Sequence, residues 1–231
     1  MAIDQGTTGS RAIVYDKQAR KIASAYQEFP QYFPRPGWVE HRPLEIWGSV
    51  YSCIQKVMQK IPDRSIAAIG ITNQRETTVM WDKKTGQPLY NAIVWQCRRT
   101  ASRCDVLKKQ RGKTEFFRKR TGLPIDAYFS ATKIEWLLKN IPRTAAAARK
   151  GNACFGTTDS WVLWKLTGGS AHATDYSNAS RTMLLNIQSL KWDEDLLHEF
   201  RIPPAILPRV LRSSGVFGTT VRVGKLPAGI P

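Results

Sequence analysis

Hydrophobic and polar positions alternate near the start of the chain, and the alternation predicts three strands. Residues 1–4 and 12–15 form two short apolar runs, and residues 21–29 alternate between apolar and polar side chains. A Gly-rich segment separates the first two runs, and a loop containing Pro34 and Pro36 ends the third strand. We therefore expect three consecutive antiparallel strands at the N-terminus.

The pattern then changes to a helical period. Apolar side chains recur at every third or fourth position over residues 44–61, with Pro43 before them and Pro62 after them, which predicts an amphipathic helix. Residues 66–72 form a continuous run of small apolar residues, which predicts a strand buried on both faces of a mixed sheet. This strand leads into residues 73–76, at the edge where open α/β sheets bind their ligands.

The later elements are shorter. Residues 77–82 and 92–95 are predicted strands, with a turn at 84–87 between them. The last segment, residues 213–231, is rich in Gly, Val and Thr and is expected to hold one or two strands. Helices are predicted at residues 98–110, 114–120, 130–140, 143–150, 159–166 and 193–200.

The order of these elements resembles that of a ribonuclease H-like domain, the unit shared by actin, hexokinase and the sugar kinases. The resemblance implies an α/β fold with a mixed sheet flanked by helices. That fold comes as two copies facing across a cleft, and a chain of 231 residues has room for one copy. We therefore expect one N-terminal domain over residues 1–231, without the second domain.

Composition agrees with a packed globule and limits the class of protein. The chain is 42% hydrophobic and has eight tryptophans, which argues against disorder. No apolar run approaches the roughly 20 residues that span a bilayer, and the chain begins with a strand-like segment instead of a leader. Four scattered cysteines, without zinc-ligand spacing, are expected to be reduced thiols. A cytoplasmic protein without a membrane partner is the resulting prediction.

The charge of the chain is strongly positive. Its 35 Lys and Arg against 18 Asp and Glu give a formal net charge of +17, which raises the hypothesis of a nucleic-acid partner. Basic residues gather at 98–120, where acids and apolar residues interleave with them as on a solvated helix face. No nucleic-acid motif accompanies them, so a basic surface without nucleic-acid binding is the favoured interpretation.

Candidate chemistry begins in the segment between the first two strands. Its two glycines can bring backbone N–H groups close to an anion, and its hydroxyls and Arg11 can add further donors. Asp4, at the end of the first strand, can hold a hydrated Mg²⁺. No dinucleotide fingerprint or P-loop is present in the sequence. From these residues alone, a phosphate-binding turn and an ordinary polar hairpin turn are both open.

Several strings of the sequence resemble the FGGY carbohydrate kinases, and among them the members that phosphorylate glycerol. They occur in the family's order along essentially the whole chain. Together they are far more specific than a single Gly-rich loop. The strings occupy residues 4–8, 36–41, 70–78, 91–100, 155–157 and 174–182.

The resemblance implies a substrate site position by position. Arg75 and Glu76 match a pair that grips the polyol, Trp95 matches an apolar wall, and Tyr128 matches a hydroxyl contact. A small triol offers only O–H groups and a short carbon face, so a donor, an acceptor and an aromatic wall suit it. Plainer interpretations are an adjacent surface ion pair at 75 and 76, a core tryptophan and a packed loop aromatic.

The resemblance also implies nucleotide contacts in the first turn. Thr7, Thr8 and Arg11 match contacts to the β- and γ-phosphates of ATP, and Asp4 matches a carboxylate near Mg²⁺. Gly9 stands where family members usually have serine. Its backbone N–H can still meet a phosphate, but the lost hydroxyl contact is expected to cost about 0.5–1.5 kcal/mol.

The implied reaction is transfer of the γ-phosphoryl group of ATP to the terminal hydroxyl of glycerol, in glycerol catabolism. In the family, the general-base aspartate follows an Ile-Pro like Ile230–Pro231, and an adenine-binding second domain comes after it. We therefore expect no catalytic base in this chain, and a fragment with little or no turnover alone. The alternatives are a non-catalytic polyol-binding or interaction module and a kinase for a related polyol or sugar. Whether a homo-oligomer covers the face left by the absent domain is left open by the sequence.

Overall fold

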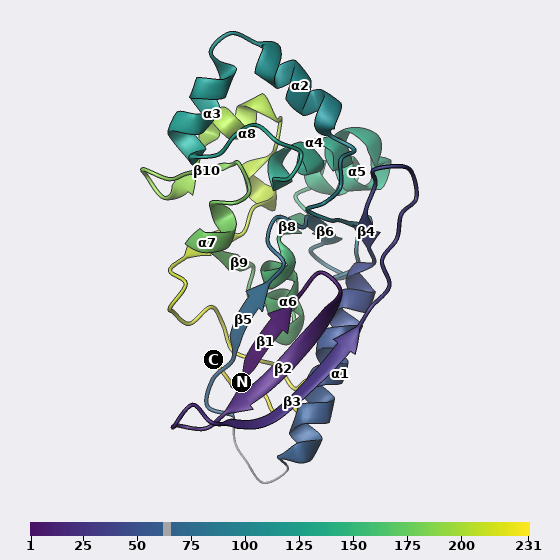
Figure 1. Cartoon of the computed structure of the whole chain (residues 1–231), viewed down its shortest axis with the longest axis vertical. Coiled ribbons are helices and arrows are strands. Elements are labelled where there is room, and N and C mark those ends of the chain that lie inside the picture. Colours follow the sequence, from purple (N-terminus) through teal and green to yellow (C-terminus); the bar gives the residue numbers. More distant parts are fainter. Residues whose placement is uncertain (62–65) are drawn as a thin grey trace.

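The computed structural model of the chain describes residues 1–61 and 66–231, with a sheet towards one end and a group of helices towards the other (Figure 1). The sheet has four strands in the order β3-β2-β1-β5. β1, β2 and β3 are antiparallel neighbours, and β5 runs parallel to β1, so the predicted mixed sheet is confirmed. The strands are β1 (Ala2–Gln5), β2 (Gly9–Tyr15), β3 (Lys21–Glu28) and β5 (Gly70–Asn73).

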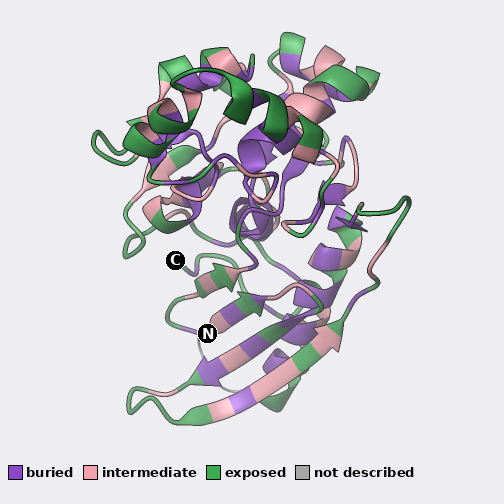
Figure 2. Ribbon diagram, turned by 45° about the horizontal axis from the view of Figure 1, so that its top comes forward, coloured by how far each residue is buried: buried purple, intermediate pink, exposed green. Residues whose placement is uncertain are grey.

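Helix α1 (Pro43–Lys60) confirms the amphipathic helix that the period predicts, and it covers one face of this sheet. Pro43 suits the first turn, where its missing N–H has no helical partner. Inward side chains of the strands and of α1 form one core cluster with helix α6 (Thr158–Leu166). The opposite side chains of the strands are largely exposed, so exposure alternates along β2 and β3 (Figure 2). The predicted helix stop at Pro62 lies outside the described residues.

The strand predicted over residues 66–72 differs from the structure in length and burial. Only Gly70–Asn73 forms β5, and its residues alternate between exposed and half-buried. Burial on both faces is therefore wrong. The reason is that one face of the sheet is open, since Thr72 lies in register with the exposed Asp4, and β5 also stands at the edge because it pairs only with β1 among the described residues. Beside this edge, Ile69 N donates to the carbonyl of Pro231 at 2.8 Å.

The second region is built mainly from helices that surround a large apolar cluster. The predicted helices are confirmed, and their ends differ from the prediction by a few residues. Buried aromatic and aliphatic side chains, such as Phe117, Ile134 and Phe200, fill the centre of the cluster. The helices are α2 (Ala101–Lys109), α3 (Lys113–Thr121), α4 (Ser130–Asn140), α5 (Pro142–Arg149) and α8 (Glu194–Glu199).

The remaining strands of the described residues form short two-stranded pairs. β4 (Glu40–His41) pairs with β7 (Ala92–Ile93), β6 (Val79–Asp82) with β8 (Ala153–Gly156), β9 (Ala173–Asp175) with β12 (Arg209–Leu211), and β10 (Leu185–Asn186) with β11 (Lys191–Trp192). Helix α7 (Tyr176–Ala179) and a 3₁₀ turn at Pro204–Ile206 complete the chain.

Two further predictions concern the end of the chain and the cysteines. Residues 213–231 are all described and contain no strand, only an isolated bridge between Val223 and Leu226, so the strands predicted there are wrong. The four cysteines are buried free thiols, as expected. Among the described residues, no helix combines the length and the apolar character needed to cross a membrane.

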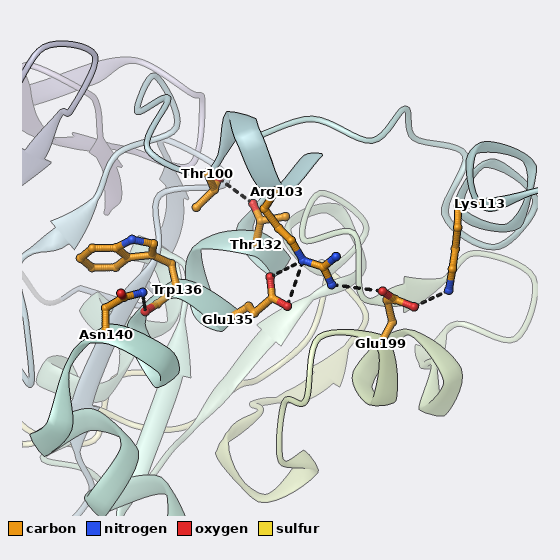
Figure 3. A network of polar contacts seen from close by, with 8 residues as sticks. All are labelled: Thr100, Arg103, Lys113, Thr132, Glu135, Trp136, Asn140 and Glu199. Carbon is orange, nitrogen blue, oxygen red and sulfur yellow. Dashed lines mark hydrogen bonds and ion pairs between the residues drawn. The ribbon is translucent and has the colours of Figure 1, made fainter. Parts of the chain in front are cut away.

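The basic segment 98–120 is held by ion pairs between helices. Arg103 of α2 lies 2.9 Å from Glu135 of α4 and 3.1 Å from Glu199 of α8, and Lys113 of α3 also pairs with Glu199 (Figure 3). Arg99 forms a fully buried pair with Glu40. A merely solvated helix face is therefore an incomplete description, because several of these cations serve to join helices.

Candidate functional site

The turn between β1 and β2 is the first part of the predicted site. It consists of residues 6–8, and Gly6 N donates to Gly9 O at 2.9 Å to close it. Gln31 Nε2 donates to the Thr7 carbonyl at 2.9 Å and braces the turn from outside. The predicted hairpin is confirmed. Its turn is shorter than the apolar pattern predicts, because residues 9–11 already pair with β3.

The loop that follows β5 lies against this turn. Gln74 N donates to Gln5 O at 2.7 Å, and Gln74 Nε2 donates to Gly6 O at 3.2 Å. β1 and β5 are parallel neighbours, so their C-terminal ends meet at one edge of the sheet. The structure therefore brings residues 73–76 next to the Gly-rich turn.

A buried histidine supports this junction. His41 Nδ1 lies 3.3 Å from Gln74 Nε2, and His41 Nε2 lies 2.5 Å from Gln31 Oε1. Burial lowers the pKa of His41 to about 4, so the ring is neutral at neutral pH. His41 thus links the loop after β5 to Gln31, which holds Thr7. The contacts of His41 therefore stabilise the turn.

Glu76 is a buried carboxylate with an unusual backbone. Its φ of 64° lies in the left-handed region, which is strained for a residue with a side chain. Its carbonyl accepts from Ser130 Oγ at 3.1 Å, and its carboxylate accepts from Arg181 Nε at 2.6 Å. These contacts fix the carboxylate in a side chain that is only 2% exposed.

Arg75, the residue before Glu76, differs from it in exposure and in contacts. It is exposed, and the partner of the Glu76 carboxylate is Arg181, 105 residues further along the chain. An adjacent ion pair at 75 and 76 is therefore wrong. The donor role of Arg75 towards a polyol stays a prediction, because nothing in the contacts of Arg75 tests it.

Trp95 joins the turn to the second region. Its indole Nε1 donates to Thr7 Oγ1 at 3.0 Å, and its backbone N–H donates to Thr77 Oγ1 at 3.3 Å. The ring of Tyr128 lies against the Trp95 ring, with 5.3 Å between centroids. Both rings are only half-buried, so the plainer interpretation as fully packed core aromatics does not describe them.

Arg181 closes the arrangement. Its guanidinium carbon lies 5.6 Å from the centroid of the Tyr128 ring and 4.9 Å from that of Phe129, while its Nε binds Glu76. Sequence reasoning assigned no role to Arg181, although it lies within the string 174–182. The signal that would have found it is the need of a buried carboxylate for a cationic partner.

Lys133 lies behind Tyr128 and is fully buried. Its Nζ donates to the Tyr128 carbonyl at 2.5 Å. Burial lowers the pKa of Lys133 to about 7, against the partial support of nearby acidic groups such as Glu76. Lys133 is therefore a second residue that the sequence did not reveal, and its contact fixes the backbone that carries Tyr128.

The remaining predicted residues lie on the open face of the sheet and in the turn. Asp4 and Arg11 are register partners on β1 and β2, and both are exposed, as is Thr8. Among the described residues, no cluster of three or more His, Cys, Asp or Glu could hold a metal ion. The role of Asp4 near a metal ion stays a prediction, because no contact of its exposed carboxylate tests it.

Comparison with known proteins identifies the family of this chain. Residues 1–231 match the N-terminal domain of the FGGY family of carbohydrate kinases. The glycerol kinase of Clostridium perfringens is 57% identical over 220 residues, which cover 94% of this chain and 44% of that protein. Glycerol kinase 2 of Thermotoga maritima is 56% identical and covers 96% of this chain and 45% of its own length.

Solved structures agree with the sequence comparison. The glycerol kinase of Plasmodium falciparum, solved with ADP, has a TM-score of 0.93 at 35% identity and covers 99% of this chain and 46% of its own. A gluconate kinase of Lactobacillus acidophilus has a TM-score of 0.86 at 26% identity, over 97% of this chain and 44% of its own. The expected ribonuclease H-like fold is confirmed.

The chain belongs to the FGGY family of carbohydrate kinases. The relatives that share more than half of its residues include the two bacterial glycerol kinases. The chain spans about half the length of the curated relatives it matches.

Proposed function

We propose that this chain carries the glycerol site and the phosphate-binding turn of an enzyme that transfers the γ-phosphoryl group of ATP to glycerol. The observation that supports this most is the hydrogen bond from Trp95 Nε1 to Thr7 Oγ1. It joins the wall of the proposed substrate site to the turn proposed for the phosphates. A phosphoryl transfer needs the acceptor hydroxyl and the γ-phosphate to be neighbours.

The proposed glycerol site uses a donor, an acceptor and an aromatic wall. Glu76 offers a fixed carboxylate, Arg75 an exposed and movable donor, and the half-buried Trp95 and Tyr128 an apolar surface with one hydroxyl. Each glycerol hydroxyl both donates and accepts, so Arg75 and Glu76 can bind neighbouring hydroxyls. A longer sugar would need further polar partners, and this supports glycerol over larger polyols.

The proposed phosphate site uses the turn and the open sheet face. Thr7, Thr8, the backbone at Gly9 and the guanidinium of Arg11 would supply donors to the phosphates, and the Asp4 carboxylate would hold a hydrated Mg²⁺. The Mg²⁺ ion neutralises phosphate charge when it is bound. The proposal assigns the general base and the adenine contacts to the part of the relatives' length that this chain does not span. A cytoplasmic location goes with it, because ATP is the phosphoryl donor.

Calorimetric titration with glycerol tests the substrate half directly. We expect the chain to bind glycerol with a millimolar or tighter Kd, and Arg75→Ala to weaken binding at least about tenfold, as loss of a charge-assisted hydrogen bond implies. Arg149→Ala, an exposed arginine at the end of α5, is the matched control and should bind as the parent does. Equal affinities for the chain and Arg75→Ala would contradict the assignment.

A fusion tests the transfer reaction. Residues 1–231 are joined to the remaining segment of the Clostridium perfringens relative, and glycerol-dependent ADP formation is measured for the chain and for the fusion. We expect turnover from the fusion and very little from the chain alone. Ordinary kinase rates from the chain alone would refute the assignment of the base to the missing part, and an inactive, well-folded fusion that does bind glycerol would refute the proposed reaction.

A further inference from the structure

The space beside Gly9 is occupied by the ring of Tyr26. A Cβ atom built on Gly9 would lie 2.5 Å from Tyr26 Oη, 2.7 Å from Tyr26 Cζ and 2.8 Å from the carbonyl oxygen of Gln27. Real Cβ contacts do not reach such distances, so a side chain at position 9 requires Tyr26 and the adjoining backbone to move. The phenolic oxygen of Tyr26 therefore stands about where a short side chain at position 9 would begin.

The location of Tyr26 follows from the register of the sheet. Gly9 pairs with Glu28 and Arg11 pairs with Tyr26, so the Tyr26 ring leans along β3 towards the turn. Tyr26 is 44% exposed and lies on the same open face as Asp4 and Arg11. The guanidinium carbon of Arg11 lies 5.5 Å from the centroid of its ring. Its hydroxyl thus lies beside the first residue after the turn, and its ring lies next to a cation.

We propose that the Tyr26 hydroxyl donates a hydrogen bond to a phosphate oxygen bound at the turn, in place of a side-chain hydroxyl at position 9. The inference rests on the phosphate site of the proposed function. A phenol is an O–H donor, and a neighbouring guanidinium favours an anion at the same place. The hydroxyl contact that Gly9 lacks is supplied from the neighbouring strand, and Gly9 is required because it leaves room for the Tyr26 ring.

Binding of a nucleotide tail without the adenosine tests this contact. The chain is titrated with sodium tripolyphosphate and MgCl₂ by calorimetry. Tyr26→Phe keeps the ring and removes the hydroxyl, so we expect binding to weaken roughly three- to tenfold. Tyr15→Phe is the matched control, because Tyr15 is also an exposed tyrosine on this sheet but lies at the far end of β2 from the turn. It should bind as the parent does.

Thermal unfolding tests the packing half of the proposal, independently of any ligand. Gly9→Ser should lower Tm by several degrees, because the new side chain meets the Tyr26 ring. In a Tyr26→Ala background the same change should cost clearly less, although the Gln27 carbonyl still restrains it. Equal Tm losses in both backgrounds would contradict the claim that Gly9 makes room for Tyr26.

The outcomes separate this inference from the function on which it rests. If Arg11→Ala loses tripolyphosphate and Tyr26→Phe binds it like the parent, the phosphate site stands and the role of Tyr26 is refuted. If the parent chain does not bind tripolyphosphate at all, the phosphate half of the proposed function falls together with the inference. Loss of binding in Tyr26→Phe with unchanged Tm, and normal binding in Tyr15→Phe, supports the assignment.

Discussion

Glu76 and Arg181 show how the site is held at the scale of single residues. The Glu76 carboxylate is almost fully buried and its backbone is left-handed, so the surrounding structure must hold it in place. Arg181 does this from 105 residues away, while its guanidinium also faces the ring of Tyr128. One arginine therefore positions both the acidic and the aromatic part of the proposed glycerol site.

Removal of this arginine should be costly. Arg181→Ala leaves a buried carboxylate without its cation, and we expect a loss of about 2 kcal/mol of unfolding free energy, less than for a fully buried pair because Arg181 is partly exposed. Urea denaturation at neutral pH measures it. Glu76→Gln/Arg181→Ala, which removes the stranded charge, should recover part of the loss. If Arg181→Ala alone is as stable as the parent, Arg181 does not hold Glu76 in place.

The lowered pKa of Lys133 predicts that the free energy of unfolding depends on pH. Its pKa is lowered from 10.5 to about 7 by burial, so between these values the unfolded chain binds more protons than the folded chain. The contribution of Lys133 to the free energy of unfolding should therefore rise as the pH rises from about 7 to about 10.5. Below pH 7 the folded chain carries the full cost of burying the charged Lys133 side chain.

The difference between the parent and Lys133→Met isolates this effect, because other titrating groups are common to both. We expect Lys133→Met to gain on the parent as pH falls from about 10 to about 7, in urea denaturation series. The variant also loses the hydrogen bond to the Tyr128 carbonyl. A constant difference across this range would mean that Lys133 stays protonated when folded.

At the scale of elements, the sequence predicts long periodic segments well. The period of α1 and the alternation of β2 and β3 reflect one buried and one exposed face, so they could be located within a few residues. β8 was missed because all four of its residues are buried and show no alternation. β9 and β12 were missed because each has three residues and depends on its distant partner for pairing.

The site was predicted only in part for the same reason. The family resemblance pointed to Thr7, Glu76, Trp95 and Tyr128, and the structure brings these residues into one arrangement. The contact of Arg181 with Glu76 joins positions 105 residues apart, and Lys133 is buried within helix α4. No local pattern reports such contacts, because they depend on how the elements pack.

Ion pairs among helices α2, α3, α4 and α8 stabilise the packing of these helices. Glu199 accepts from both Arg103 and Lys113 (Figure 3). Glu199→Gln should cost about 1 kcal/mol, since these groups are partly exposed and solvent screens part of the attraction. Glu194→Gln, an exposed acid on the same helix, is the matched control. Equal unfolding free energies for the two variants would show that the Glu199 ion pairs contribute nothing.

At the scale of the whole molecule, two regions meet where the proposed chemistry lies. The sheet supplies the turn and its open face, and the helical region supplies Tyr128, Lys133 and the Ser130 that binds Glu76. The formal net charge of +17 gives the molecule a field that attracts an anionic nucleotide. The Trp95 side chain connects the two halves of the proposed site through Thr7, and Gln74 connects the loop after β5 to the same turn.

The Trp95 indole N–H resonance in a ¹H–¹⁵N NMR spectrum tests that connection most directly. Trp95→Phe identifies the signal among the eight tryptophans by its disappearance. Because the indole N–H binds Thr7 while its ring faces Tyr128, glycerol and magnesium tripolyphosphate should each shift this one resonance. If saturating amounts of both ligands leave the Trp95 signal unmoved, glycerol and phosphate do not meet at this residue and the proposed site is wrong.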